Sequence, residues 1–431
     1  MEKYIGNKKS IVSDIYAFID EGQIRNNLLI DVFSGTTNVG QFFKQKGYSI
    51  VSNDINALSY VLGVAYIKNN SFPKYTKLLN KINKKRKLQD PETAQKDISW
   101  IQKRINGDVV FSDTYFNDIN FQENIYPLIL VLEYLNNINI NKLSKTDLLF
   151  YDYYSKDGAH SDFISARGTT GKRNYFSSTN AKKLGKIMST IKKWKNEKLI
   201  NEKELCILLT SIIEEVSLIA NVNGTFHDFN RDKLFPNSLV PLHLKPIAIN
   251  IYGDRTKTYT VIKGDANKLS KNTKFRKAFK TSSTLYIDPP YNFRQYSSYY
   301  HLLNFIASYC KIKNIQNYAK DFQYVRGQNM KDNFDSQYCY KDTFAASLTD
   351  LIKTIKSKDV LISYCDVNNH WNKKNKERIS EEGREVIINI FKTLNFEHYI
   401  KQPYEIERQN YQSQNGEHKE NIKELLFYGR R

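Results

Sequence analysis

The chain has 431 residues, with 65 Lys and Arg against 45 Asp and Glu, which gives a formal net charge of +20 at pH 7. This length allows about two or three domains with substantial cores. The basic balance favours a polyanionic partner such as nucleic acid, although AT-rich coding would also produce a chain rich in Lys, Asn, Ile and Tyr.

The four cysteines are far apart and form no CxxC pair, and the seven histidines have no metal-ligand spacing. The sequence therefore predicts neither a disulfide framework nor a metal site. The start of the chain lacks the apolar core of a signal peptide, and Glu214 and Glu215 interrupt the most apolar stretch, 205–220. We therefore expect a cytoplasmic, prokaryotic type of protein that does not enter a membrane.

Residues 1–68 alternate between the apolar spacing of helices and that of strands. The segments that carry this alternation are a helix over 11–19, a strand over 28–33, a helix over 39–46 and a strand over 48–53. A strand, a helix and a second strand in this order predict a βαβ unit.

Residues 69–254 have a different character, with mostly helical patterns, polar loops between them and a basic run at 81–87. The expected helices cover 98–105, 124–136, 181–195 and 202–221, and 152–178 is predicted as an exposed loop region. The stretch has no convincing series of parallel strands. We interpret it as a mainly helical domain inserted into an α/β domain.

From residue 255 the strand and helix patterns alternate again. Strands are expected at 259–262, 285–287 and 360–364, helices at 300–308, 343–356 and 384–393, and late antiparallel strands at 397–400 and 424–428. Residues 1–68 and 255–431 are therefore predicted to form one Rossmann-like, doubly wound α/β domain with a mixed sheet.

The tetrapeptide Asp288-Pro289-Pro290-Tyr291 directly follows a predicted strand. It therefore lies at the carboxyl edge of the sheet, where α/β folds usually bind ligands. A carboxylate and a backbone carbonyl can both accept hydrogen bonds from an exocyclic amine, while two prolines stiffen the loop and remove competing N–H donors. The tyrosine ring offers a face on which a flat base can stack. An ordinary proline-rich turn is the alternative interpretation.

A second motif, 31–40, ends one predicted strand and opens a helix. Gly35 lets the backbone turn and approach a ligand closely, and the helix start presents N–H groups to a carboxylate or phosphate. Asp54 ends the next strand, about twenty residues further on, where a carboxylate can hold the hydroxyls of a ribose. The pattern fits any nucleoside cofactor, and a plain strand-to-helix turn is the alternative. The absence of GxGxxG argues against a nicotinamide cofactor, and the absence of GxxxxGK[ST] excludes a P-loop.

Together these motifs resemble the Dam-like, alpha-class N6-adenine DNA methyltransferases. The resemblance rests on KYIGNKKS (3–10), DVFSGTTNVG (31–40), SNDIN (52–56) and DPPYNFRQYSSYYHLLNFIA (288–307), with RNYFSSTNAKKLGKI (173–187), ANVNGTFHDF (220–229) and HKENIKELLFYG (418–429) similar to a restriction-modification subgroup. It implies a class I methyltransferase fold, S-adenosylmethionine as cofactor and a target-recognition domain at 69–254. Thr37 departs from the pattern, since many members have Gly there.

The resemblance also implies roles for individual residues. Tyr4, Gly6 and Lys8 match the segment that closes over S-adenosylmethionine, and Asp31, Phe33, Ser34 and Gly35 match the loop around its methionine moiety. Asp54 matches the ribose ligand, and Asp265 matches the acid beside the cofactor's adenine. Asp288, Pro289, Pro290 and Tyr291 match the catalytic tetrapeptide, which would receive an adenine flipped out of double-stranded DNA and direct its amine at the methyl group.

Six further residues are expected to contact DNA: Arg294 and Tyr296 beyond the tetrapeptide, and Lys172, Arg173, Asn174 and Asn223 in polar loops of the insertion. Arg and Asn side chains read guanine and adenine edges, and Lys and Arg also bind phosphates. A loop salt bridge, a packed ring or a solvated charge is the alternative interpretation for each of them.

Other functions share parts of this pattern. An N4-cytosine methyltransferase would usually begin the tetrapeptide with Ser, and an RNA or protein-glutamine methyltransferase with Asn. A catalytically inactive DNA-binding subunit is the alternative of a different class, and the presence of both the cofactor motif and the catalytic motif argues against it. The chain is expected to act as a monomer, and the resemblance suggests a separate cognate restriction endonuclease as its partner.

Overall fold

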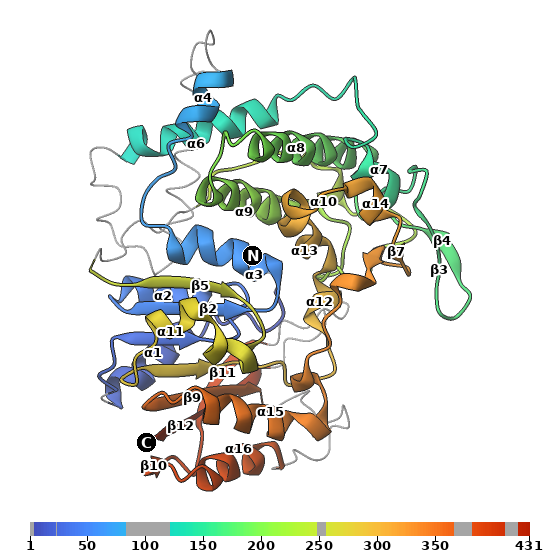
Figure 1. Cartoon of the computed structure of the whole chain (residues 1–431). Helices are drawn as coiled ribbons and strands as arrows, with labels where there is room; N and C mark the ends of the chain where they lie inside the picture. Colours follow the sequence, from blue (N-terminus) through green and yellow to red (C-terminus); the bar gives the residue numbers. More distant parts are fainter. Residues whose placement is uncertain (1–3, 23, 83–120, 248–255, 366–381, 410–420) are drawn as a thin grey trace. The chain divides into compact units, whose positions relative to one another are not determined.

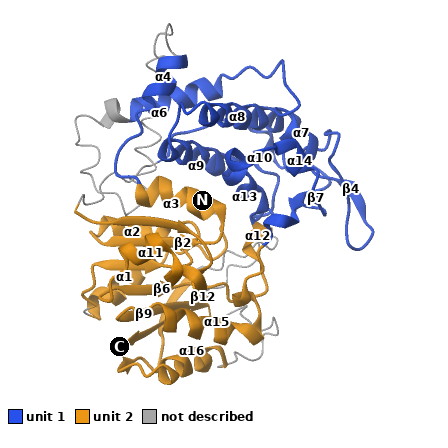
Figure 2. Cartoon of the chain, viewed as in Figure 1, with its two compact units in different colours: residues 1, 69–251, 300–333 blue, residues 2–68, 252–299, 334–431 orange. Residues whose placement is uncertain are grey.

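The computed structural model describes residues 4–22, 24–82, 121–247, 256–365, 382–409 and 421–431 (Figure 1). The chain forms two compact units (Figure 2). Residues 2–68, 252–299 and 334–431 form the first, which we call the sheet unit. Residues 69–251 and 300–333 form the second, which we call the helical unit.

The sheet unit is built on one mixed sheet that has eight strands among the described residues. The strand order is β10-β12-β9-β6-β1-β2-β5, and β11 pairs with β12. The strands are β1 (Leu28–Asp31), β2 (Ser49–Asp54), β5 (Tyr259–Lys263), β6 (Thr284–Ile287), β9 (Asp359–Cys365), β10 (His398–Tyr399), β11 (Tyr404–Gln409) and β12 (Asn421–Arg430). The five strands from β9 to β5 are parallel, and β12 is antiparallel to β9.

Strand β1 lies between β2 and β6, which makes it the point at which the chain changes its direction across the sheet. After β1 the chain adds β2 and β5 on one side, and β6 and β9 follow on the other. Loops leave such a point in opposite directions, so a crevice opens at the carboxyl ends of β1 and β6. The expected doubly wound α/β fold is confirmed, and both predicted motifs follow these two strands.

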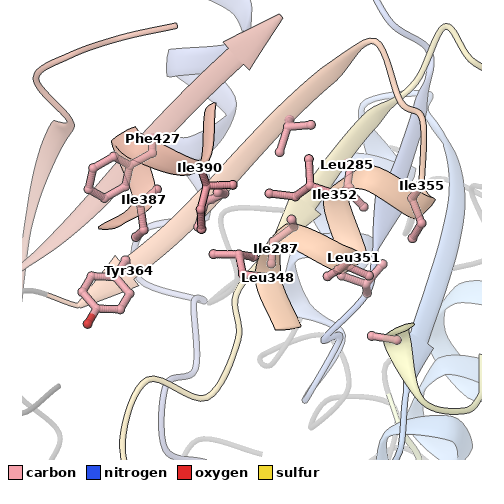
Figure 3. Close-up of a cluster of buried hydrophobic side chains, with 14 of the residues drawn as sticks. Leu285, Ile287, Leu348, Leu351, Ile352, Ile355, Tyr364, Ile387, Ile390 and Phe427 are labelled. Carbon is pink, nitrogen blue, oxygen red and sulfur yellow. The ribbon is translucent and has the colours of Figure 1, made fainter. Parts of the chain in front are cut away.

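The helices of this unit pack their apolar sides against the sheet. They are α1 (Val12–Glu21), α2 (Asn38–Gln45), α3 (Ala57–Gly63), α11 (Thr273–Ala278), α12 (Tyr296–Tyr299), α15 (Lys341–Thr354) and α16 (Glu382–Thr393), with the short turns η1 (Val64–Lys68), η3 (Ala266–Lys271) and η6 (Gln337–Cys339). Figure 3 shows Leu348 of α15 beside Ile287 of β6, and Leu351 of α15, Leu285 of β6 and Ile387 of α16 belong to the same cluster. All five are buried, so this cluster fixes the strand that leads into the tetrapeptide.

The helical unit contains α4 (Thr76–Ile82), α6 (Phe121–Asn136), α7 (Leu149–Tyr154), α8 (Ser178–Asn196), α9 (Glu202–Ile219), α10 (Pro236–Leu239), α13 (His301–Ser308) and α14 (Ile315–Ala319), with the short turns η4 (Tyr309–Lys311) and η5 (Met330–Asp332). Asn201 and Glu204 start α9 with a capping box, in which each side chain accepts from the other residue's backbone N–H. Two small hairpins complete the unit: β3 (Asp162–Ile164) with β4 (Thr170–Lys172), and β7 (Phe322–Gln323) with β8 (Gln328–Asn329).

Residues 300–333 lie in a different unit from the one that the sequence assigned to them. They belong with 69–251, whereas we expected them to stay with the sheet. The reason is the apolar side of α13, which packs against α9, and the Phe305 ring, which lies 5.4 Å from the ring of Phe150. A helix that follows a strand does not have to return to the same sheet when another apolar surface covers it.

One further expectation was wrong, and one strand was missed. The segment 152–178, predicted as an exposed loop region, contains the end of α7 and the β3–β4 hairpin, and its Tyr154, Tyr175 and Phe176 are buried. Strand β11 was not expected at all. The predicted helix 98–105 and most of the basic run 81–87 lie outside the described residues. Among the described helices, none is long and apolar enough to span a bilayer.

Candidate active site

A cavity of about 450 Å³ opens at the carboxyl edge of the sheet, and all of its lining residues belong to the sheet unit. Its volume lies in the range of small-molecule sites. The lining comes from the amino-terminal segment and from the loops after β1, β2, β5 and β6, completed by residues 334–350: Tyr4–Lys8, Asp31–Thr36, Asn38, Val39, Asp54–Asn56, Gly264–Asn267, Asp288–Tyr291, Gln295–Ser297, Phe334, Ser336–Tyr338, Ala346, Ser347 and Asp350. The predicted cofactor loop and the predicted catalytic loop therefore share one cavity.

The loop after β1 makes a tight turn over this cavity. Gly35 has φ +46°, and a Cβ atom there would lie 3.2 Å from the ring of Tyr4, which covers the turn. Ser34 donates its N–H to the Asn53 carbonyl, and Thr37 donates its N–H to the Ser34 carbonyl. Thr37, the residue that departs from the family pattern, is buried and has φ +65°. The loop thus keeps a left-handed conformation at Thr37, although a β-branched residue is strained in that region of backbone conformation.

Two buried carboxylates face the cavity beside this turn. Asp54 accepts from the N–H of Gly35 at 2.9 Å on one oxygen and from the N–H of Asn56 at 2.9 Å on the other. Asp31 is buried, and among the described residues its Oδ1 has no hydrogen-bond partner. Burial raises the pKa of both groups, and for Asp31 the neighbouring Asp288 and Asp54 raise the pKa further. The site therefore holds a carboxyl oxygen with unused acceptor capacity, and a cationic ligand group beside it would favour the ionised form of Asp31.

The far wall of the cavity follows β5. Asp265 lines it, accepts from the N–H of Asn267 at 3.1 Å and lies 3.5 Å from Lys268 Nζ. Two other residues of this wall, Asn267 and Tyr338, were not predicted from the sequence. The Tyr338 hydroxyl donates to Asn267 Oδ1 at 2.7 Å, and its ring lies edge-on to Phe33 at 4.9 Å. Together they form a partly apolar wall with amide and carboxylate groups, which suits a purine ring.

On the other side of the cavity, Asp288 is held by an ion pair. Lys8 Nζ donates to Asp288 Oδ1 at 2.8 Å, and Lys8 is buried. No hydrogen bond to Asp288 Oδ2 is found among the described residues. The sequence placed Lys8 with the segment that closes over the cofactor, whereas its ammonium group lies against the carboxylate of the catalytic loop. Lys8 therefore fixes one oxygen of Asp288 and leaves the other available to accept from a ligand.

Behind Lys8 the charges continue into the core. Lys8 Nζ lies 3.3 Å from Glu424 Oε1, and Arg408 Nε donates to Glu424 Oε2 at 2.9 Å. Ser363 also donates to Glu424. Glu424 lies on β12 opposite Cys365 of β9, and Arg408 lies on β11 opposite Ile422. Two carboxylates and two cations thus alternate, which balances the charges that burial would otherwise penalise.

These contacts set the charge states around the tetrapeptide. The pKa of Asp288 is raised to about 6, mainly because the carboxylate is buried. Lys8 opposes this rise, and Glu424 adds to it. Burial would lower the pKa of Lys8, but the two adjacent carboxylates keep it raised above its usual value. The two cations lower the pKa of Glu424 despite burial. Asp288 is therefore the carboxylate of this group that can change its charge near neutral pH.

The rest of the tetrapeptide and its partners shape the mouth of the cavity. Pro289 is buried, Pro290 is half-buried, and the Tyr291 ring is buried and lies edge-on to Tyr364 at 5.9 Å. Tyr296, expected to contact DNA, lies in the cavity wall, where its hydroxyl donates to the Ile5 carbonyl at 3.3 Å. Gly6 has φ +74°, and a Cβ atom there would lie 3.3 Å from the Tyr296 hydroxyl. The amino-terminal segment is thus fastened to the catalytic loop.

Just outside the cavity, Arg294 and Phe293 extend from the same loop. Arg294 is half-buried, with its guanidinium 5.9 Å from the Tyr299 ring, and Phe293 is 78% exposed. Phe293 was not predicted as a site residue, and the sequence alone does not distinguish it from an apolar residue of the core. Its exposure next to a base-sized cavity is the signal that only the structure gives.

The four candidates in the helical unit differ in exposure. Lys172, at the end of β4, and Asn223 are exposed. Arg173 and Asn174 are buried, and Arg173 donates to the carbonyls of His160, Tyr324 and Val325. The prediction that Arg173 and Asn174 contact DNA directly therefore needs correction, because their polar groups are used inside the protein. Figure 1 shows the β3–β4 hairpin extending from the helices of its own unit.

The chain is similar in sequence to known DNA-modifying enzymes. Residues 4–149 match the model of the D12 class N6 adenine-specific DNA methyltransferase family. Over 99% of its length the chain is 31% identical to the modification methylase StsI of Streptococcus sanguinis and 29% identical to the type II methyltransferase M.FokI of Planomicrobium okeanokoites, and it covers 51% and 52% of those proteins. The chain therefore spans about half the length of these two relatives. It is also 26% identical to the type II methyltransferase M.NlaIII of Neisseria lactamica over 84% of this chain and 82% of that protein.

Proposed function

We propose that the chain is a D12-class N6 adenine-specific DNA methyltransferase and that it methylates N6 of an adenine flipped out of duplex DNA. One observation carries the proposal: Asp31 with its unused oxygen and Asp288 with one oxygen fixed by Lys8 line the same cavity. A donor and an acceptor bound there would meet at the ends of β1 and β6.

S-adenosylmethionine is the methyl donor that fits this cavity. When bound, it supplies a methyl group on a positively charged sulfur. The free oxygen of Asp31 would accept from the ammonium of its methionine part, and the tight turn at Gly35 lets the backbone approach that part. Asp54 would hold the ribose hydroxyls, and Asp265 with Tyr338 would border the adenine ring.

The catalytic loop would act on the adenine amine. The Asp288 carboxylate, with Lys8 on its Oδ1, and the Pro289 carbonyl would accept the two amine hydrogens, while Tyr291 would border the ring. These hydrogen bonds would draw the nitrogen lone pair out of conjugation, so that the nitrogen could bond to the methyl carbon while the bond from that carbon to sulfur breaks and the neutral thioether S-adenosylhomocysteine leaves. The amine proton leaves after or during this step, and an ionised Asp288 can accept it. Positioning and fixed charges would supply most of the rate.

The surfaces that would hold DNA follow from exposure. Arg294 and Phe293 extend beside the cavity, and Lys172 and Asn223 are exposed on the helical unit. Lys and Arg bind phosphates, and Asn can read adenine edges. The net charge of +20 favours the approach to a polyanion. The relatives named above are modification methylases, so a separate cognate restriction endonuclease is the proposed partner.

The test is transfer of labelled methyl groups from S-adenosylmethionine to plasmid DNA, followed by digestion and identification of the modified nucleoside. We expect N6-methyl-2′-deoxyadenosine from the wild-type chain and no label with Asp288→Ala. N4-methylcytosine would change the target base, and absence of label with a folded chain that binds S-adenosylmethionine would contradict the proposal. Sequencing the modified sites would give the recognition motif at the same time.

A further inference from the structure

The turn between β7 and β8 in the helical unit is held from within by buried side chains. Arg173 donates from Nη2 to the Tyr324 carbonyl at 2.9 Å and from Nε to the Val325 carbonyl at 3.2 Å. His301 Nε2 donates to the Arg326 carbonyl at 2.8 Å, and the Tyr154 hydroxyl donates to the Gly327 carbonyl at 2.6 Å. Four consecutive carbonyls of an exposed turn are thus bound by three buried side chains from distant segments.

This arrangement is unusual for a surface turn, because water normally satisfies such carbonyls. Gly327 has φ +66°, and a Cβ atom there would lie 2.8 Å from Arg173 Nε, so the approach needs glycine. Tyr324 also has a positive φ, +59°. Buried hydrogen bonds that hold every carbonyl of the turn fix its backbone, and the half-buried Arg326 also donates from Nε to Gln328 Oε1 at 2.9 Å. Tyr324 is 48% exposed, and the Arg326 guanidinium lies 5.9 Å from its ring.

A second loop lies against this turn. Arg326 Nη1 donates to His227 Nε2 at 3.1 Å, and His227 is exposed in the segment that also contains Asn223. Asn221 fixes that segment from within by donating to the carbonyls of Asn174, Asn230 and Lys233. Buried amides and a buried guanidinium therefore join loops from three parts of the chain into one preorganised surface, which we call the three-loop surface: Lys172, Asn223, His227, Tyr324 and Arg326.

The side chains of this surface are of types that bind nucleic acid in other proteins, and all of them except the half-buried Arg326 are exposed. A guanidinium matches a phosphate or the O6 and N7 of guanine, a tyrosine ring packs on a sugar or base, and Asn matches adenine. The nearby carboxylate of Asp228 lies 3.3 Å from Arg231, so another cation already balances it. Rigid presentation lowers the entropy that binding must remove, which gives a physical reason for so many buried polar groups under loops.

We propose that Tyr324 and Arg326, held by the turn 324–327, contact the duplex during site recognition. This inference rests on the proposed function and adds a recognition element that lies outside the sequence motifs. Arg173 and His301 serve it as positioning residues from below, and Asn221 fixes the adjoining loop. The element would contact DNA through Arg326 with a phosphate or a guanine edge and through Tyr324 by ring packing.

The experiment compares Arg326→Ala and Tyr324→Ala with the wild-type chain. Arg25→Ala and Tyr404→Ala serve as matched controls, because Arg25 and Tyr404 are exposed on the sheet unit. The probes are a short duplex with the methylated motif read from wild-type modification, the same duplex with that motif scrambled, and S-adenosylmethionine alone. Methylation by the wild-type chain is measured first, so that failure of the proposed function is recognised separately.

We expect Arg326→Ala to weaken binding of the motif duplex roughly tenfold and to leave S-adenosylmethionine affinity unchanged. Equal weakening on both duplexes, with a salt slope lower by about one, identifies a phosphate contact, and weakening only on the motif duplex identifies base reading. Both outcomes support the inference. Wild-type affinity for both duplexes in Arg326→Ala and Tyr324→Ala would overturn it, and Arg326→Gln, which also removes the charge, repeats the comparison if the alanine variant does not fold.

Discussion

The sheet unit and the helical unit both bury polar side chains, but they connect them differently. In the sheet unit, Asp31 and Asp288 border a cavity, and Asp31 keeps an oxygen without a partner among the described residues. In the helical unit, Arg173 and Asn221 direct their donors at backbone carbonyls of loops. Buried groups with spare capacity mark a place for a ligand, whereas buried groups whose capacity is used mark a scaffold for what lies above them.

The largest effect should come from the carboxylate of the catalytic loop. Asp288→Ala removes the acceptor for the amine, so we expect methyl transfer to fall by at least about a hundredfold while S-adenosylmethionine affinity stays within a few-fold. Single-turnover transfer and calorimetric titration of the cofactor measure the two quantities. Because Lys8 loses a partner, a lower melting temperature is also expected, and the assay is run well below it. Full activity in this variant would remove Asp288 from the mechanism.

The helical unit gives the second prediction, which separates scaffold from contact. Arg173→Ala leaves carbonyls of the turn 324–327 without their buried donor, at a cost of about 1–3 kcal/mol for each group. We expect weaker DNA binding, unchanged cofactor affinity, and faster amide exchange over 322–329 but not over 34–56. Exchange is measured by mass spectrometry, and DNA affinity by titration.

Arg173→Lys is the matched control for this prediction. It keeps the charge but loses the planar fork that reaches neighbouring carbonyls, so a scaffold role predicts partial loss of DNA binding. If Arg173 instead contacted DNA through its charge alone, the lysine variant would bind like the wild-type chain and the exchange over 322–329 would not change.

The sequence predicted the sheet unit well because its motifs are contiguous. A strand followed by a glycine turn or by Asp-Pro-Pro-Tyr reports its own place at the sheet edge, and the fold and the family resemblance are confirmed. Glu424 could not be assigned in this way. It reaches Lys8 through the pairing of β12 with β9, and that register depends on the whole sheet.

Arg173 shows the opposite failure. It lies in a Gly-rich segment between Lys172 and Asn174, which favours an exposed, DNA-reading loop. Its burial depends on carbonyls more than a hundred residues away, at Tyr324 and Val325. Local composition reports the residue types that bind DNA, but only long-range packing decides whether a given donor faces outward or inward.

The third prediction returns to the cofactor side of the cavity. Asp31→Asn keeps the shape but removes the charge that would meet a ligand ammonium, so S-adenosylmethionine affinity should fall roughly tenfold or more. The folded-state pKa of Asp31 is raised, so its charge destabilises the fold at neutral pH, and the melting temperature should not fall. Asp20→Asn, at an exposed site on α1, is the control. A change confined to DNA affinity would contradict the assignment.

The smallest expected effect is a shift in a pH profile. Since the pKa of Asp288 is about 6 and the ionised form is the proposed acceptor, the single-turnover rate should rise through pH 6 and level off above it. Glu424→Gln removes the negative charge that raises this pKa and leaves Lys8 to Asp288, so the midpoint should move to lower pH. Rates are measured with saturating cofactor and DNA at each pH. An upward shift would mean that Glu424 acts mainly by holding Lys8 against Asp288, and an unchanged midpoint would separate the buried charges from the catalytic carboxylate.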